Sequence, residues 1–146
     1  MAEELLRLLR PDLQDLVPYA VPHYPGCIKL DANESPYDFA PEVLSEVLRR
    51  LGGQLFNRYP DPQATELCRK IADYTGLAPE NILAGNGSDE LILNLFLAFG
   101  VGGRVVITPP TFTMYAIHAR IAGAAVVTVA RREDFSLDLG ALLREA

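Results

Sequence analysis

Residues 81–99 constrain the fold of this chain more than any other stretch. They begin with the apolar residues 82–84, pass through the glycine-rich residues 85–87 and end in a nearly unbroken apolar run over 91–99. This order is typical of a short strand, a tight turn and a helix that is buried on most sides. The stretch therefore predicts a strand–turn–helix unit in the interior of a larger fold.

The first turn of this expected helix has the features of an anion site. Ser88 is expected to cap the helix through its hydroxyl, and Asp89 and Glu90 suit the positive end of the helix dipole. A glycine turn that opens a helix also leaves backbone N–H groups free for a phosphate. An ordinary strand–turn–helix without a ligand has the same features, so both interpretations stay open on these residues alone.

Composition excludes several classes of protein. Hydrophobic residues make up 49% of the chain and charged residues 22%, as in a globular domain rather than a disordered one. The formal net charge of −6 argues against a nucleic acid or a membrane surface as partner. Cys27 and Cys68 form no CxxC pattern, so neither a disulfide framework nor a metal site is predicted. The N-terminus lacks the apolar run of a signal peptide or membrane span, so a cytoplasmic location is expected.

Residues 1–36 are expected to form an N-terminal arm. The pattern predicts a helix over 3–9, a helical turn over 12–17, an irregular proline-rich passage over 18–26 and a short strand over 28–30. An arm of this kind needs a surface to lie on, and a partner subunit is one candidate.

Residues 37–78 are expected to be mainly helical. Pro41 suits a helix start, and apolar residues at helical spacing predict a helix that ends at Gly52-Gly53. A second helix is predicted over 65–74, with Gly76 as its C-terminal cap.

Residues 79–146 alternate between strand and helix patterns. After the unit already described, the pattern predicts a strand over 104–108, a helix over 112–122, a strand over 125–130 and a helix over 138–145. This alternation predicts an α/β fold with a parallel sheet and right-handed crossovers. Ligands of such sheets bind beyond the carboxyl ends of the strands, so the turns at 85–88 and 108–113 are expected to face one pocket.

Two common nucleotide-binding turns do not match these residues. A dinucleotide-binding turn has the pattern G-x-G-x-x-G, but Glu90 stands where the third glycine belongs. That fold also places an acidic residue after the second strand, where this chain has Thr108-Pro109-Pro110. A P-loop needs Gly-Lys followed by Ser or Thr, and this sequence does not occur in the chain.

Four motifs occur together along the chain: Leu30-Asp-Ala-Asn-Glu-Ser-Pro36, Arg58-Tyr-Pro-Asp61, Gly85-Asn-Gly-Ser-Asp-Glu90 and Pro109-Pro-Thr-Phe-Thr-Met-Tyr115. Their order and spacing resemble the N-terminal part of the histidinol-phosphate aminotransferases, which are pyridoxal-phosphate enzymes of fold type I. The resemblance implies a partial fold of that type. Residues 1–36 would be its arm, 37–78 the helical part of its small-domain or dimer region, and 79–146 the start of its cofactor-binding large domain.

The resemblance implies how the chain would hold pyridoxal 5'-phosphate. Gly87, Ser88 and Asp89 match the turn whose backbone amides bind the cofactor phosphate, in agreement with the first of the two interpretations given above. Tyr115 matches the aromatic residue that stacks on the pyridine ring, although without the resemblance it would be interpreted as a core aromatic. Because carboxylates repel a phosphate, the side chains of Asp89 and Glu90 are expected to point away from the anion.

The resemblance also implies a homodimer with a shared active site. Tyr59 matches a tyrosine that reaches the cofactor phosphate of the other subunit, where its phenol can donate one hydrogen bond. Tyr19, Asn33 and Glu34 match N-terminal positions near the substrate.

The chain has no residue that matches the Schiff-base lysine of this family. Fold-type I chemistry uses that lysine to attach the cofactor and then to move a proton. Lys29 and Lys70 are the only lysines, and neither lies in a segment that resembles the family's lysine motif. The sequence therefore matches only the N-terminal portion of such an enzyme, and this chain alone is predicted not to transaminate.

These implications lead to one main prediction and two alternatives. The main prediction is the N-terminal part of an aminotransferase that exchanges an amino group between histidinol phosphate and 2-oxoglutarate in histidine biosynthesis. One alternative is another pyridoxal-phosphate enzyme of the same fold, such as threonine-phosphate decarboxylase or an aromatic aminotransferase. The other is a truncated module that binds phosphate or dimerises without catalysis.

Overall fold

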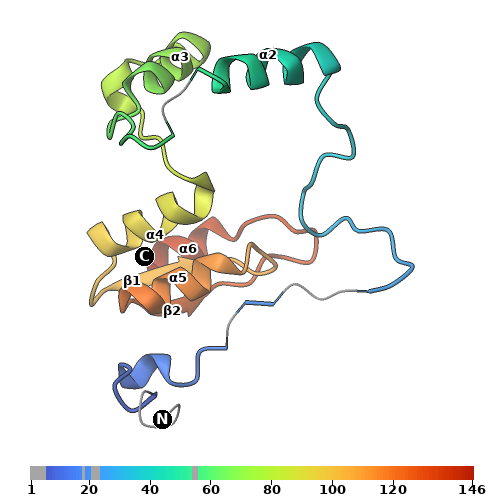
Figure 1. Cartoon of the computed structure of the whole chain (residues 1–146). Helices are drawn as coiled ribbons and strands as arrows, with labels where there is room; N and C mark the ends of the chain where they lie inside the picture. The colour runs from blue at the N-terminus through green and yellow to red at the C-terminus, as the bar shows by residue number, and fades with distance from the viewer. Residues whose placement is uncertain (1–5, 18, 21–23, 54–55) are drawn as a thin grey trace.

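The computed structural model describes residues 6–17, 19–20, 24–53 and 56–146. Within these residues the sheet consists of two parallel strands, β1 (Arg104–Ile107) and β2 (Ala125–Thr128), which pair along their whole length. The strands lie in the lower half of the molecule in Figure 1. The predicted strands over 104–108 and 125–130 and their parallel pairing are confirmed.

The hydrogen bonds between the two strand segments continue beyond the strands themselves. The N–H of Val129 donates to the carbonyl of Ile107 at 2.9 Å, and the N–H of Arg131 donates to the carbonyl of Pro109 at 3.1 Å. Main-chain hydrogen bonds therefore fix the carboxyl ends of the two strands, from which the chain continues into the 108–113 turn.

Helix α5 (Met114–Ala122) connects the two strands and packs against both. Its buried residues include Ala119 and Ala122, whose small side chains let the helix approach the sheet closely. Gly123 ends the helix in the left-handed conformation with φ of 80°. The helix predicted over 112–122 is confirmed, with a start two residues later than expected.

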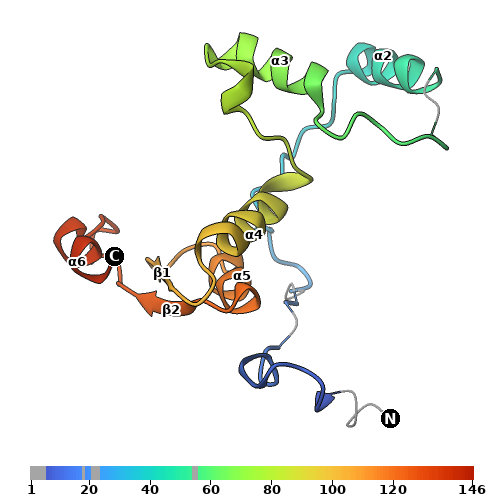
Figure 2. The ribbon, with the colours of Figure 1, turned by 90° about the vertical axis from the view of Figure 1, so that its left-hand side faces the viewer.

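Helices lie on both sides of the two strands, although only α5 contacts the strands extensively among the described helices. Helix α4 (Gly87–Phe99) packs against α5, and Figure 2 shows both on one side of the strands, with α6 (Leu139–Glu145) on the other. Asp138 caps α6, because its carboxylate accepts a hydrogen bond from the N–H of Ala141 at 2.9 Å. The part of the fold that surrounds the sheet therefore has the layered α/β arrangement that the sequence predicts.

Two expectations for residues 81–99 are wrong in this structure. No residue of α4 is buried, and Leu95, Leu97 and Phe99 are each at least half exposed, because only α5 contacts α4 extensively among the described helices and strands. The expected strand over 82–84 is also absent. Ile82 has the extended backbone of a strand, with φ of −117° and ψ of 126°, but no described segment pairs with it.

Helices α2 (Pro41–Leu51) and α3 (Thr65–Thr75) lie apart from the sheet in Figures 1 and 2. Both match the predicted helices, and Gly76 closes α3 as expected, with φ of 74° and its N–H bonded to the carbonyl of Ala72. The short 3₁₀ helix η2 (Pro79–Asn81) packs on α3 and leads into the extended residues that precede α4. None of the described helices could cross a membrane, since all are too short or too polar.

The described part of the N-terminal arm contains less regular structure than the sequence predicts for it. Of the helix expected over 3–9, residues 3–5 lie outside the described residues, Leu6 is helical and 7–9 form a turn. The helical turn expected over 12–17 is the shorter 3₁₀ helix η1 (Pro11–Leu13). In the proline-rich passage, 18 and 21–23 are also outside the described residues. The expected strand over 28–30 is absent, because no described segment pairs with these residues.

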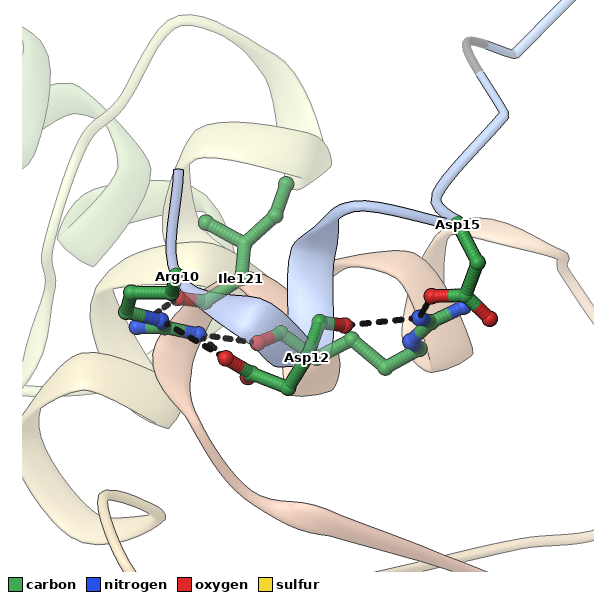
Figure 3. Close-up of polar contacts among 5 residues, drawn as sticks. Arg10, Asp12, Asp15 and Ile121 are labelled. Carbon is green, nitrogen blue, oxygen red and sulfur yellow. Dashed lines mark hydrogen bonds and ion pairs between the residues drawn. The ribbon is translucent and has the colours of Figure 1, made fainter. Parts of the chain in front are cut away.

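An arginine clasp, formed by Arg10, Asp12, Asp15 and Arg120, joins the arm to the end of α5, and Figure 3 labels its three residues from the arm. The Arg10 guanidinium donates to the carbonyls of Arg120 and Ile121 at 2.8 and 3.1 Å, in the last turn of α5, where a cation is favourable. Arg120 reaches back to the carbonyl of Asp12 at 2.7 Å and to the carboxylate of Asp15. The arm therefore lies on its own chain at this point.

We expect Gly76→Ala to lower the free energy of unfolding by about 1 kcal/mol, because an L side chain is strained at a positive φ. No atom lies within 4 Å of the position that a Cβ would take at Gly76, so the cost comes from the backbone alone. Urea denaturation measures the change. The matched control is Gly52→Ala, since Gly52 ends α2 at φ of −60°. If both variants lost the same free energy of unfolding, the positive φ of Gly76 would not be the cause.

The arginine clasp predicts that Arg10→Ala loosens η1. The amides of Leu13 and Leu16 donate hydrogen bonds to carbonyls within the same segment. In the variant, opening of this segment no longer has to break the clasp contacts, so these amides should exchange with solvent about fivefold faster. Hydrogen exchange followed by NMR gives the rates. Arg7→Ala, in the same segment but outside the clasp, serves as the control. Unchanged exchange in Arg10→Ala would show that the clasp does not hold η1.

Candidate functional site

The turn at 85–87 opens α4 through Gly87, which has φ of 80°. The N-terminal cap is Asn86, not Ser88 as predicted, and the Asn86 side chain makes no capping hydrogen bond. Ser88 instead lies within the first helical turn, because the left-handed Gly87 already belongs to the helix. The expected hydroxyl cap is therefore wrong, but the glycine turn and the helix start are where the sequence places them.

Two backbone amides at the start of α4 are free to bind an anion. The N–H of Gly87 donates to the carbonyl of Gly85 at 2.9 Å, and the N–H of Asn86 donates to the Glu90 carboxylate. The N–H groups of Ser88 and Asp89 have no acceptor among the described residues. They lie at the positive end of a helix dipole, which is the environment that a phosphate favours.

The two carboxylates of this helix start differ in their surroundings. Glu90 folds back onto the main chain and accepts the hydrogen bond from Asn86. Asp89 is half exposed, and its Oδ1 atom lies 3.7 Å from Nε2 of His118 on α5. The charge of Glu90 is thus partly offset by a main-chain amide, whereas Asp89 accepts no hydrogen bond among the described residues.

Tyr115 lies in the first turn of α5, beside the carboxyl end of β1. Its ring is half-buried and meets the ring of Phe112 edge-on, with the centroids 5.8 Å apart and the planes at 89°. It helps to line a pocket of about 270 Å³ together with Phe96, Thr108 and Thr111. The pocket is lined by residues of α4, β1 and α5, but the turn at 85–88 does not line it, so a pocket shared by the two turns stays a prediction.

His118 on α5 lies close to the start of α4, and no sequence pattern identified it beforehand. It follows Tyr115 by three residues on α5, so the two side chains share one face of the helix. The residue is only 7% exposed, and neither ring nitrogen has a hydrogen-bond partner among the described residues. The spacing from Tyr115 is the one signal in the sequence that could have indicated this residue.

The other predicted residues do not join this group in the structure. Tyr59 is fully exposed, and Tyr19 is 56% exposed, without a hydrogen bond to another described residue. Asn33 has a positive φ of 53°, and Glu34 forms an ion pair with Lys29 at 3.3 Å. Their assignment to the cofactor or the substrate stays a prediction.

The two lysines and the largest of the cavities described do not belong to this group of residues. Lys29 and Lys70 are exposed, and neither lines the Tyr115 pocket. A larger cavity of about 600 Å³ lies between α3 and residues 82–84, but it contains none of the predicted site residues. Among the described residues, no cluster of three His, Cys, Asp or Glu side chains could hold a metal ion.

Comparison with known proteins places the chain in a family context. The family model "Aminotransferase class I and II" matches residues 25–146. Histidinol-phosphate aminotransferase 1 of Carboxydothermus hydrogenoformans is 45% identical over 138 residues, which are 94% of this chain and 38% of that protein. The histidinol-phosphate aminotransferase of Thermococcus gammatolerans is 45% identical over 129 residues, covering 88% of this chain and 38% of its own length. The chain thus spans less than half of these relatives.

Solved structures of similar fold agree with this assignment. Histidinol-phosphate aminotransferase from Sinorhizobium meliloti, in complex with pyridoxal-5'-phosphate, has a TM-score of 0.67 and 31% identity. The match covers 78% of this chain and 32% of that one. An aspartate aminotransferase from Thermotoga maritima has a TM-score of 0.71 and 25% identity over 82% of this chain and 34% of that one.

Proposed function

This chain belongs to the family of class I and II aminotransferases, and we propose that it is the N-terminal part of a pyridoxal-phosphate enzyme that acts on histidinol phosphate. In this proposal the enzyme exchanges an amino group between histidinol phosphate and 2-oxoglutarate in histidine biosynthesis. The names of the relatives that share 45% of their aligned residues with the chain support this choice of substrate. The single observation that carries the proposed cofactor site is the pair of free amides at Ser88 and Asp89, on the helix that packs against α5.

The residues at the start of α4 fit the phosphate of the cofactor. The N–H groups of Ser88 and Asp89 can each donate to a phosphate oxygen, and Gly87 gives the backbone the left-handed turn that exposes them. Because no side chain stands on Gly87, and no atom lies within 4 Å of where a Cβ would be, an anion can approach the amides closely. The main chain thus holds the anion without a basic side chain.

Tyr115 fits the ring of the same cofactor. When bound, pyridoxal phosphate supplies an electron-accepting ring for amino-group chemistry at the substrate Cα. The Tyr115 ring, half-buried on the face of α5 that also carries His118, would stack on that ring and fix its orientation. His118 approaches Asp89, so the ring-binding and phosphate-binding residues belong to two helices in contact.

The shared active site remains part of the proposal. We assign Tyr59 to the cofactor phosphate of a second subunit, and Tyr19, Asn33 and Glu34 to the neighbourhood of the substrate. The full exposure of Tyr59 and the partial exposure of Tyr19 leave both phenols available to another subunit. A homodimer is therefore the proposed assembly.

A related pyridoxal-phosphate enzyme is the second candidate. The fold similarity to an aspartate aminotransferase, with a TM-score of 0.71, supports a different amino donor on the same scaffold. Turnover of histidinol phosphate, aspartate, an aromatic amino acid and threonine phosphate by the full protein that carries this chain would distinguish them. Preference for any donor other than histidinol phosphate would overturn the proposed substrate.

The phosphate site predicts that Ser88→Pro weakens the affinity for pyridoxal 5'-phosphate by about tenfold, because proline removes one N–H that donates to the anion. Proline is tolerated in the first turn of a helix, so α4 should persist. The readout is the change in the Asp89 amide shift of the full protein during titration with the cofactor, because the Ser88 amide is absent from the proline variant. Ser88→Ala keeps the N–H and is the control. Equal affinity in the proline and alanine variants would refute the site.

The proposal also predicts that this 146-residue chain alone is inactive. Borohydride reduction of the chain with pyridoxal 5'-phosphate should leave Lys29 and Lys70 without stoichiometric attachment, since both are exposed and neither lines the Tyr115 pocket. Mass spectrometry of peptides measures the attachment, and an assay with histidinol phosphate and 2-oxoglutarate measures turnover. Stoichiometric labelling of one lysine together with turnover would show that the prediction is wrong.

A further inference from the structure

His118 has an environment that packing alone does not explain. The residue lies on the inner side of α5, is only 7% exposed and has two ring nitrogens without a hydrogen-bond partner among the described residues. Buried polar atoms are nearly always paired in folded proteins, because an unpaired one has lost its water without compensation. The imidazole therefore needs a partner that lies within its reach.

Asp89 is the acidic group that faces His118. Nε2 of His118 lies 3.7 Å from Oδ1 of Asp89, and no other ion pair of His118 occurs among the described residues. This separation is too long for a hydrogen bond, but a shift of less than about 1 Å closes it to the normal range. Since Asp89 also contributes a free N–H to the anion site, His118 approaches that site from α5.

A phosphate at the Ser88 and Asp89 amides would be repelled by the nearby carboxylates. The Glu90 carboxylate already accepts a hydrogen bond from the N–H of Asn86, which draws it back onto the turn. The Asp89 carboxylate accepts no hydrogen bond among the described residues and is free to rotate towards the anion. Both carboxylates must therefore be held away from the anion by a hydrogen bond. The main chain donates such a bond to Glu90 but not to Asp89.

We propose that His118 is a positioning residue for the phosphate site: its imidazole donates an N–H to the Asp89 carboxylate and holds that carboxylate away from the bound anion. The inference rests on the proposed function, because it needs a phosphate at Ser88 and Asp89. His118 acts through Asp89 and does not itself contact the phosphate. The buried position of the imidazole between α4 and α5 gives the hydrogen bond a fixed direction.

The test is a double-variant cycle between the two side chains in the full protein that carries this chain. Affinity for pyridoxal 5'-phosphate is followed through the Ser88 and Asp89 amide shifts, which report the site without reference to activity. His118→Leu removes the donor, so the freed carboxylate should weaken binding by about tenfold. His118→Gln retains an N–H donor and should restore most of the affinity.

The decisive comparison uses Asp89→Asn. Because this variant has no negative charge to be held back, adding His118→Leu to it should change the affinity less than about twofold. A tenfold loss in both backgrounds would show that His118 acts only through packing and would overturn the inference. Full affinity in His118→Leu alone would overturn it as well. His118→Met provides a second side chain without a donor if leucine disturbs folding, which urea denaturation detects.

The same titration separates this inference from the proposed function. If the unsubstituted protein binds the cofactor without moving the Ser88 and Asp89 amides, the phosphate site itself is wrong, and the inference falls with it. If those amides move and the His118 variants bind as tightly as the unsubstituted protein, the phosphate site stands and only the role of His118 is wrong.

Discussion

Parallel pairing of β1 with β2 obliges the chain to cross back over the sheet between the two strands, and α5 is that crossover. The helix approaches the strands closely because Ala119 and Ala122 face inward, and α4 then packs against it. This arrangement fixes the position of Tyr115 beside the carboxyl end of β1 and of His118 opposite the start of α4. The candidate site therefore follows from the topology of two short strands.

The electrostatics of the site depend on the main chain. The chain carries a net charge of −6, and two acidic residues stand in the first turn of α4, yet this turn offers free amides to an anion. Peptide dipoles and N–H groups do not appear in a count of side-chain charges, so a negative protein can still hold a phosphate locally. The hydrogen bond from the Asn86 N–H to the Glu90 carboxylate shows that the main chain offsets part of the acidic charge at this turn.

Sequence patterns predicted the helices and strands that are determined mainly by residues close together in the sequence. The helices of residues 41–51 and 65–75 follow from apolar spacing and glycine ends, the first also from a proline start, and the strands β1 and β2 follow from β-branched runs. Residues 82–84 have strand-like residues and an extended backbone at Ile82, but a strand also needs a neighbour, which a local pattern cannot supply. The exposure of α4 was not predicted for the same reason. Apolar side chains indicate that a helix favours burial, but they do not show whether another segment covers it.

The residues of the candidate site differ in how directly the sequence indicates them. Gly87, Ser88 and Asp89 stand out because a glycine turn before an acidic helix start has a direct electrostatic meaning. His118 is a single histidine in an apolar helix, and only its spacing from Tyr115 and the packing of α4 on α5 reveal where it points. No sequence pattern indicated the arginine clasp, because its hydrogen bonds to α5 join residues 105 to 111 positions apart. During synthesis on a ribosome, Arg10 emerges long before the carbonyls it will bind, and closing so long a loop costs about 4 kcal/mol of chain entropy. Exposed polar contacts are individually too weak to meet that cost. The beginning of the polypeptide can therefore attach only after the crossover helix has settled on its strands, and it is the first part to detach when they separate.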